Sequence, residues 1–302
     1  MRLQRTIKNE AALEGIGLHT GVQTAIRLAP APADTGVVFW RKDRNVLIKA
    51  DSSSVTDTAF ATTLGSNNSS SVTRIKTVEH LMASLAGLGI DNLIVEVKGP
   101  EIPIMDGSAH PFVELILKAG IVKQPAPRRF IKITRPIEFR EGNSEICAFP
   151  NEGTLITYQT QYKHKLLGSQ RLSIRLDEES FVKELASART FGFLKDVELM
   201  RANGLAKGGS LDNAVLFDDS GVMNEGGLRF ADECIRHKTL DLVGDLSLAG
   251  YPIMGHIVAM KTGHSTNVKF VKALLASPEC WELAALEALS PMPALSFQPN
   301  LL

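Results

Sequence analysis

Hydrophobic and polar residues alternate in short runs between positions 20 and 60. The runs VQTAIRLAP, TGVVFW and NVLIKA are separated by Pro, Gly or Asp. Alternation with a period of two residues, interrupted by turn-forming residues, is typical of half-buried β-strands. The chain is therefore predicted to begin with a β-sheet.

The period of the pattern then becomes helical. The segment TVEHLMASLAGLG has apolar residues at helical spacing and stops at Gly87 and Gly89. The next segment, IDNLIVEVKG, predicts a strand, and SAHPFVELILKAG predicts a second helix. The first half of the chain is thus expected to be a sheet followed by helix, strand and helix.

A break in the pattern separates this half from the rest. The segment QPAPRRF, residues 124–130, interrupts the apolar pattern with two prolines and two arginines, and it places a domain boundary near residue 127. Beyond it, FIKITRPIEFR, EICAFP and TLITYQTQYK predict strands, and SFVKELASART predicts a helix. The expected domains are residues 1–127 and 128–302.

The closing unit of the first half returns near the end of the chain. ECIRHKTLDLVGDLSLAG predicts a helix, YPIMGHIVAMKTG a strand and STNVKFVKALLAS a helix. When Gly89 is matched with Gly250, His80 falls opposite Asp241, each nine residues before its glycine. A further unit at about residues 190–217 has no counterpart in the first half, and we expect it to be a lid or substrate insert.

The helix of the second repeat carries polar residues at regular intervals. His237, Asp241 and Asp245 recur every four residues, so they share one stripe of the helix. A metal ion is a natural partner for such groups, because burying them without one costs several kcal/mol. Catalytic zinc sites use three protein ligands and leave one position for water. His237 and Asp241 supply two ligands, and the repeat nominates His80 as the third.

Other residues near these ligands suit the hydrolysis of an amide. Glu79, which precedes the third ligand, is expected to be the general base, and His264 at the start of a helix is expected to be the general acid. Asp245 is expected to accept a hydrogen bond from His264. Lys238 and Thr190 are expected to stabilise the oxyanion of the transition state.

Composition narrows the classes of function. The 302 residues include 33 basic and 33 acidic side chains, and this balance excludes a general nucleic-acid binder and favours a small-molecule partner. Charges scattered through the N-terminus and the lack of a long apolar run indicate a cytoplasmic protein with no transmembrane segment. The three cysteines are far apart, so we expect neither a disulfide framework nor a thiolate metal cluster. No heptad pattern indicates assembly, and a monomer is expected.

Seven motifs in order resemble one enzyme family. TVEHL, IDN, PIMDGSA, SARTFGF, GGS, RHKTLDLVGDL and KTGH resemble the zinc-dependent UDP-3-O-acyl-N-acetylglucosamine deacetylases of lipid A synthesis. The resemblance implies an α+β fold of two similar domains, each a β-sheet layered with α-helices as a β-α-α-β sandwich, with the active site between the domains. It implies the release of acetate from the 2-N-acetyl group of the acylated UDP-sugar. It also implies the same ligand, base, acid and oxyanion residues as above.

The resemblance also implies where the substrate binds. The insert would form a passage for the fatty acyl chain, Lys261 would contact the diphosphate, and His19 would be a further active-site residue. The chain departs from the family pattern at Ser144, where a basic residue is expected, and at Lys165, where proline is expected. The residues expected to line the passage are Phe191, Phe193, Val197, Gly209, Ser210, Ala214 and Leu216.

Other interpretations of the sequence stay open. Zinc is the expected ion, although His and Asp ligands also accept Fe²⁺ or cobalt. A non-catalytic protein with a closed structural site would use His19 or His264 as a fourth ligand. A third interpretation is a hydrolase or hydratase acting on a different acylated nucleotide sugar. The remaining histidines, His110, His164 and His256, are assigned no role.

Overall fold

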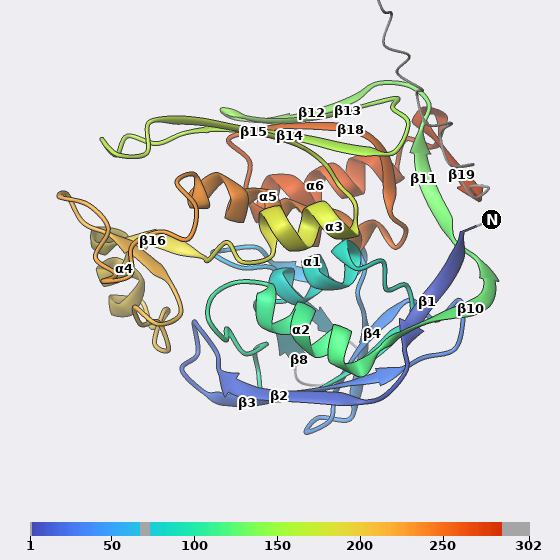
Figure 1. Cartoon of the computed structure of the whole chain (residues 1–302), viewed down its shortest axis with the longest axis horizontal. Coiled ribbons are helices and arrows are strands. Elements are labelled where there is room, and N and C mark those ends of the chain that lie inside the picture. The colour runs from blue at the N-terminus through green and yellow to red at the C-terminus, as the bar shows by residue number, and fades with distance from the viewer. Residues whose placement is uncertain (1, 67–72, 286–302) are drawn as a thin grey trace, which may run out of the picture.

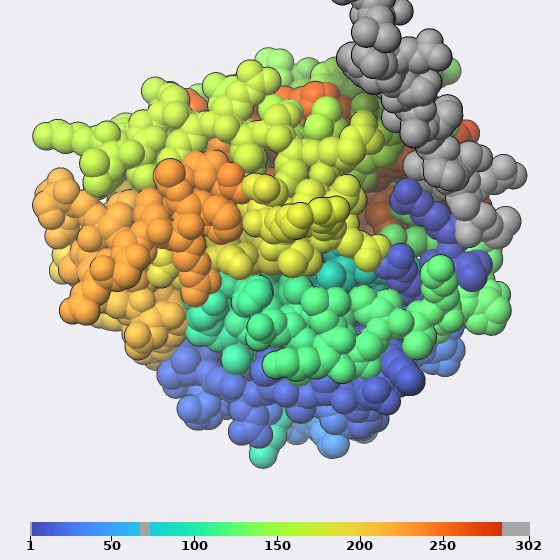
Figure 2. All heavy atoms as spheres, in the orientation of Figure 1, coloured from blue at the N-terminus to red at the C-terminus, as the bar shows by residue number. Residues whose placement is uncertain are grey.

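Two β-sheets enclose the principal helices of the protein. The structure is a computed structural model, and it describes residues 2–66 and 73–285. Figure 1 shows one sheet along the top, the other along the bottom, and helices from both halves of the chain between them. In Figure 2, atoms of the first half fill the lower part of the molecule and atoms of the second half fill the upper part. The predicted α+β fold of layered sheets and helices is confirmed.

The sheet of the first half has a central strand, β9 (Leu93–Lys98), between an antiparallel and a parallel neighbour. Alternate residues of its strands, such as Ile26, Leu28 and Val95, are buried toward the helices. The apolar face of the alternating pattern therefore forms the core, as expected for a sheet covered on one side. In spatial order the strands are β2 (Ala11–Ile16), β3 (Gln23–Pro30), β9, β4 (Val37–Arg41) and β5 (Val46–Lys49).

The sheet of the second half repeats this topology. Its central strand is β18 (Ile253–Met260), again antiparallel to one neighbour and parallel to the other. The corresponding strands are β12 (Ile137–Glu141), β13 (Ser144–Phe149), β18, β14 (Thr154–Gln161) and β15 (Ser169–Arg175). Two further strands, β11 (Arg129–Ile133) and β19 (Trp281–Ala285), extend the sheet beside the start of β18.

The layer between the sheets is built on the first helix of each repeat. These helices, α1 (Glu79–Gly87) and α5 (Glu233–Leu246), pack against each other. Both are followed by a glycine in the left-handed region, Gly89 at φ +67° and Gly250 at φ +83°. The second helices of the repeats are α2 (His110–Ala119) and α6 (His264–Leu275).

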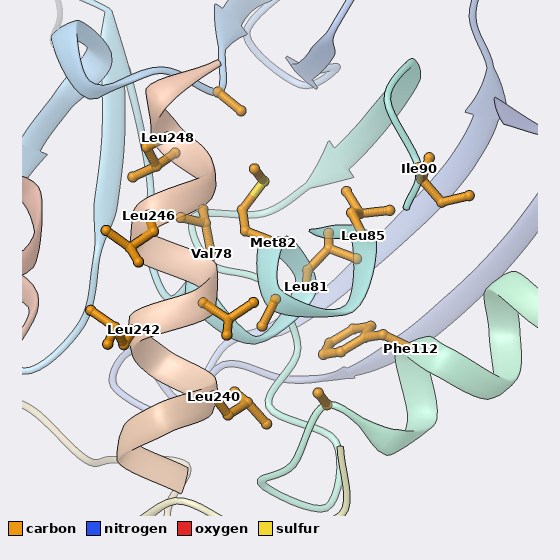
Figure 3. Packing of buried hydrophobic residues seen from close by; sticks show 14 of the residues in the cluster. Val78, Leu81, Met82, Leu85, Ile90, Phe112, Leu240, Leu242, Leu246 and Leu248 are labelled. Atoms are coloured by element: carbon orange, nitrogen blue, oxygen red, sulfur yellow. The ribbon is translucent and has the colours of Figure 1, made fainter. Parts of the chain in front are cut away.

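The contact between α1 and α5 is a large part of the hydrophobic core (Figure 3). Fully burying one such side chain stabilises the fold by about 1.5–3 kcal/mol. The contact therefore fixes the two helices firmly against each other. The buried residues labelled in Figure 3 on these helices or beside them are Val78, Leu81, Met82, Leu85, Leu240, Leu242, Leu246 and Leu248.

The segment proposed as a linker forms a strand. Strand β10 (Ile121–Pro127) pairs antiparallel with β1 (Leu3–Ile7), and β11 begins two residues later. The chain thus crosses between the two large sheets in extended conformation. The boundary near residue 127 stays a prediction.

The helix predicted for SFVKELASART, residues 180–190, is only partly present. Helix α3 (Glu178–Ser180) continues as a π-helical turn, Phe181–Leu185, and the chain is irregular after Ala186. The reason is tertiary: beyond Ala186 the amides of Arg189 and Thr190 donate to Glu233 and Gly107, which are far away in the sequence, and not to carbonyl groups one helical turn back. The prediction was wrong over the second half of this segment.

Two smaller units lie outside the two large sheets. The insert contains a parallel pair, β16 (Phe191–Phe193) with β17 (Val215–Phe217), and helix α4 (Leu194–Ala202). A three-stranded sheet contains β6 (Val55–Asp57), β7 (Thr63–Ser66) and β8 (Thr73–Ile75). The three cysteines are free thiols. Within residues 2–66 and 73–285, no helix is both long enough and apolar enough to cross a bilayer.

Candidate active site

The start of α1 and one face of α5 meet at a cluster of three buried polar side chains. His80 lies in the first turn of α1, and His237 and Asp241 lie one turn apart on α5. One ligand atom from each residue lies within 4.8 Å of the other two. The structure therefore brings together the three side chains that the sequence nominated, although they come from opposite halves of the chain.

The spacing of these atoms fits a small metal ion. The Nε2 atoms of His237 and His80 lie 3.3 and 3.6 Å from Oδ1 of Asp241. Tetrahedral bonds of ~2.0–2.1 Å place two ligand atoms about 3.3 Å apart. Oδ1 of Asp241 is buried and accepts no hydrogen bond within the described part of the chain. A buried carboxylate oxygen without a donor is costly, and a cation would compensate it.

The two imidazoles are held in the state that binds metal. Nδ1 of His237 donates to the carbonyl oxygen of Ala188 at 3.0 Å, which leaves Nε2 unprotonated and facing Asp241. Burial lowers the pKa of His80 to about 3 and also lowers the pKa of His237. Burial alone would raise the pKa of Asp241, but His237 and the nearby cations hold it below its usual range. Neutral imidazoles and an ionised carboxylate are the ligand forms required.

Glu79 occupies the position expected of a base beside the cluster. It is the first residue of α1, it is 3% exposed, and its Oε2 accepts a hydrogen bond from the amide of Thr62 at 3.0 Å. Its Oε1 lies 3.9 Å from Nε2 of His264. Burial raises the pKa of Glu79 to about 8, with contributions from the neighbouring carboxylates. The raised pKa makes this carboxylate a stronger proton acceptor.

His264 is held by a buried carboxylate at the start of α6. Its Nδ1 lies 2.9 Å from Oδ2 of Asp245. The same carboxylate accepts bonds from the hydroxyl of Thr62 at 2.6 Å and from the side-chain amide of Asn267 at 2.9 Å. Burial opposes protonation of His264, but Asp245 and Glu79 raise its pKa to about 9. The imidazolium is therefore favoured at neutral pH.

Lys238 contacts the cluster directly, whereas Thr190 is placed by its backbone hydrogen bonds. Nζ of Lys238 is 3.5 Å from Oδ2 of Asp241, and this acid raises the pKa of the lysine although burial opposes it. The backbone of Thr190 donates to the carbonyl oxygen of Gly107 and accepts from the amide of Val215, both at 2.8 Å. Thr190 is thus fixed between the two halves of the chain, two residues from the carbonyl group that binds His237.

Part of the insert forms an aromatic cluster beside the three buried polar residues. Phe191 is the link, since its ring centroid lies 6.3 Å from that of His237 and 5.8 Å from that of Tyr162. Phe193 contacts His164 and Phe217. Val197 on α4 faces Gly192, and Gly209 lies next to Leu18. The other insert candidates are Ser210, which is exposed, and Ala214 and Leu216, which are half-buried.

The remaining substrate candidates lie in three separate places. His19 is buried, and neither of its ring nitrogens has a hydrogen-bond partner among the described residues. Burial lowers its pKa, and the charge on His264 acts in the same direction. Lys261 donates to Gln161 at 3.3 Å, and the hydroxyl of Ser144 donates to the carbonyl oxygen of Lys261. Lys165 is exposed between β14 and β15.

A second group of potential ligands lies on the hairpin of β12 and β13. Glu138, Glu145 and Cys147 have ligand atoms within 4.8 Å of one another. Arg140 forms ion pairs with both carboxylates, so their charge is already compensated. Burial raises the pKa of Cys147 to about 11 and disfavours the thiolate. This group is a poorer metal site than the buried cluster.

Sequence reasoning missed several residues that hold the site. Thr62 donates both to Glu79 and to Asp245, and it comes from a loop without a periodic pattern. Glu101 is fully buried and accepts bonds from the amides of His19 and Thr20 and from two threonine hydroxyls. For Asn267 a signal existed, since it follows His264 by three residues on the same helix face.

The fold and this site are typical of metal-dependent hydrolases: two imidazoles and a carboxylate meet beside a carboxylate and imidazolium pair. A family model described as UDP-3-O-acyl N-acetylglycosamine deacetylase matches residues 4–276, so the chain belongs to that family. The chain is therefore an enzyme, a deacetylase that hydrolyses an amide.

Close relatives support this assignment over nearly the full length. A protein named UDP-3-O-acyl-N-acetylglucosamine deacetylase from Thermodesulfovibrio yellowstonii is 51% identical over 284 residues, which are 94% of this chain and 95% of the relative. Proteins of the same name from Geobacter sp. and Acidithiobacillus ferrooxidans are both 47% identical and cover 94% and 92% of this chain and 92% of their own lengths.

Proposed function

We propose that this enzyme removes acetate from the 2-N-acetyl group of UDP-3-O-acyl-N-acetylglucosamine with the help of one zinc ion. The product would be UDP-3-O-acyl-glucosamine, and the reaction would be the committed step of lipid A synthesis in the cytoplasm. The observation that carries the proposal is the buried cluster of His80, His237 and Asp241, in which Oδ1 of Asp241 accepts no hydrogen bond from residues 2–66 and 73–285. The substrate is inferred from the names of the relatives.

His80, His237 and Asp241 would hold the ion. Bound there, it would supply Lewis-acid polarisation of the amide carbonyl and of the attacking water. The same ligands accept Fe²⁺, so the ion used in the cell depends on its supply. Because both imidazoles are neutral, Asp241 would be the only charged ligand. A divalent ion held by these residues would therefore keep a net positive charge, which would attract the carbonyl oxygen of the substrate.

Glu79 and His264 would move the protons. The carboxylate of Glu79 takes the proton of the water as it attacks. Its pKa is raised to about 8, so the ionised form is a stronger base and predominates above about pH 8. Protonated His264, whose pKa is about 9, donates to the departing nitrogen. Asp245 keeps Nδ1 of His264 as a donor, so the proton that is delivered comes from Nε2.

Lys238 and Thr190 would stabilise the oxyanion. The ammonium of Lys238 lies beside Asp241 and adds positive charge to the side of the site where the carbonyl oxygen would bind. Thr190 would donate its hydroxyl to the same oxygen. Its backbone is already fixed, so this donor needs little reorganisation.

The substrate would extend from this centre in two directions. Lys261 would contact a phosphate of the UDP group. His19 would contact the substrate beside His264. The acyl chain would lie along the insert, where small residues leave room against the backbone. The residues proposed to line this passage are Phe191, Phe193, Val197, Gly209, Ser210, Ala214 and Leu216.

Metal analysis combined with acetate release tests the proposal. The wild-type protein should bind about one zinc ion and release acetate from the acylated UDP-sugar. Glu79→Ala should keep the metal and lose turnover, whereas His80→Ala should lose the metal. An exposed carboxylate on α2, Glu114, provides the matched control Glu114→Ala, with both properties unchanged. Retained metal in His80→Ala would refute the ligand assignment.

Chelation separates the catalytic metal from a closed structural one. Removal of a catalytic ion should abolish turnover while the fold persists, since the α1–α5 contact is largely apolar. Unfolding of the protein on chelation would favour the structural alternative. A panel of acylated nucleotide sugars would identify a different substrate.

A further inference from the structure

A buried ion pair fixes the segment around residue 189 to the start of α5. Glu233, the first residue of α5, is 1% exposed and accepts four hydrogen bonds. Its Oε1 accepts from the backbone amide of Arg189 at 2.9 Å and from Nε of the same residue at 2.8 Å. Its Oε2 accepts from Nη2 of Arg189 at 3.1 Å and from the amide of Arg229 at 2.7 Å. One carboxylate thus holds both the side chain and the backbone of Arg189.

Arg189 lies between a residue that contacts the candidate active site and one that is proposed to act in it. The carbonyl oxygen of Ala188 accepts the bond from Nδ1 of His237, and the backbone of Thr190 is bonded to Gly107. Glu233 lies four residues before His237, so both side chains project from the same face of α5 toward this segment. The helix therefore contacts the segment twice, once through the carboxylate and once through the imidazole.

We propose that the Glu233–Arg189 pair is a positioning device for His237, and through the adjacent backbone for Thr190. The proposal rests on the proposed function, because it takes His237 as a metal ligand. An imidazole can rotate about its side-chain bonds, and its Nδ1 bond to a fixed carbonyl group sets both the ring orientation and the tautomer. The Ala188 carbonyl group shares a peptide unit with the amide of Arg189, and that amide donates to Glu233 on α5. On its other side, the amide of Ala188 donates to the carbonyl oxygen of Leu185.

A purely structural role is the competing explanation. An acid in the first turn of a helix interacts favourably with the helix dipole, and a buried ion pair also affects stability. Asp232 offers a matched control, since it carries the same charge at the same helix end. It pairs with Arg236 at 2.6 Å, and no hydrogen bond or ion pair joins it to residues 188–190 in the described chain.

The experiment compares Glu233→Gln with Asp232→Asn in the full chain, well below the unfolding temperature of each. Zn²⁺ affinity is measured by competition with a chelator, and the visible spectrum is recorded with Co²⁺ bound. Glu233→Gln should weaken Zn²⁺ binding by about 10- to 100-fold and change the Co²⁺ absorption bands. Asp232→Asn should change neither. Wild-type affinity and spectrum in folded Glu233→Gln would overturn the proposal.

A second variant keeps the test valid if Glu233→Gln does not fold. Replacing Glu233 and Arg189 together with methionine removes both buried charges and leaves neither unpaired. This double variant should fold and still bind Zn²⁺ more weakly than the wild type. Unchanged Zn²⁺ affinity in the double variant would overturn the positioning role but not the metal centre. A wild-type protein that binds neither Zn²⁺ nor Co²⁺ would overturn the metal centre as well.

Discussion

A single added methyl group at Gly244 should damage the active site more than it damages the fold. Gly244 lies on α5 where that helix crosses the start of α1. A Cβ at this position would be 2.2 Å from the carbonyl oxygen of Glu79 and 3.0 Å from its carbonyl carbon. Contacts between such atoms need about 3.5 Å. The backbone at Glu79 must therefore move by about 1 Å, and His80 must move with it.

The expected magnitudes differ for stability and for turnover. Overpacking a core costs about 1–3 kcal/mol. Alanine recovers about 1 kcal/mol because it favours the helix more than glycine does. The net loss of unfolding free energy in Gly244→Ala should thus be about 0–2 kcal/mol. A shift of about 1 Å in catalytic groups can lower turnover about 100-fold. Turnover should then fall far more than stability.

Kinetics and unfolding of the same samples test this reasoning. kcat/KM for acetate release, Zn²⁺ affinity and denaturant unfolding would be measured for Gly244→Ala. Gly226→Ala is the control, since Gly226 has an ordinary φ and no atom within 4 Å of its added Cβ. The control should match the wild type throughout. Wild-type kcat/KM together with wild-type metal affinity in Gly244→Ala would refute the proposed dependence on this helix crossing.

Three further changes have expected outcomes. The pKa of Glu79 is about 8 in the folded chain against a usual 4.5, so its stabilising contribution is present below pH 4.5 and is lost as the pH rises through 8. In thermal unfolding of metal-free protein, Glu79→Gln should therefore melt above the wild type at a pH over 8, and equal melting there would contradict the shift. Thr62→Val removes the hydroxyl that donates to Asp245 but keeps the amide that donates to Glu79, so kcat should fall about tenfold with Zn²⁺ binding retained; an unchanged kcat would count against this role. Leu81→Ala, in the buried core around α1, should lower the unfolding free energy by about 2–5 kcal/mol in denaturant titrations, and a loss under about 1 kcal/mol would show that the site collapses around the cavity.

The repeat was the most informative feature of the sequence. It predicted that a helix, a strand and a helix would recur, and each sheet does place the repeated strand, β9 or β18, between an antiparallel and a parallel neighbour. It also predicted that His80 would meet Asp241, and their side chains are 3.6 Å apart. This worked because regular periods report which face of an element is buried. In both halves, the pattern of apolar and polar residues along the helix indicates which of its faces is buried.

The supports of the site could not be predicted in the same way. Thr62 and Glu101 lie in segments without a period, and Ala188 contributes only a carbonyl group, which every residue has. The stretch that carries Ala188 is not helical, because the amides of Arg189 and Thr190 donate to Glu233 and Gly107, which are far away in the sequence. Such positions depend on tertiary packing, which local sequence patterns do not predict.

The two repeated helices show how one backbone arrangement can produce an asymmetric site. His80 and Asp241 occupy matched positions, nine residues before their glycines, and both therefore face the contact between the helices. Three residues further along each helix, Ala83 carries a methyl group, whereas Gly244 has no room for one against the backbone of Glu79. At the pair after that, Ser84 donates to backbone carbonyl groups and Asp245 accepts from His264. The pairing of the two helices thus brings the three candidate ligands together. The differences between matched positions let Glu79, the proposed base, lie against α5 and give His264, the proposed acid, a carboxylate partner from α5 alone.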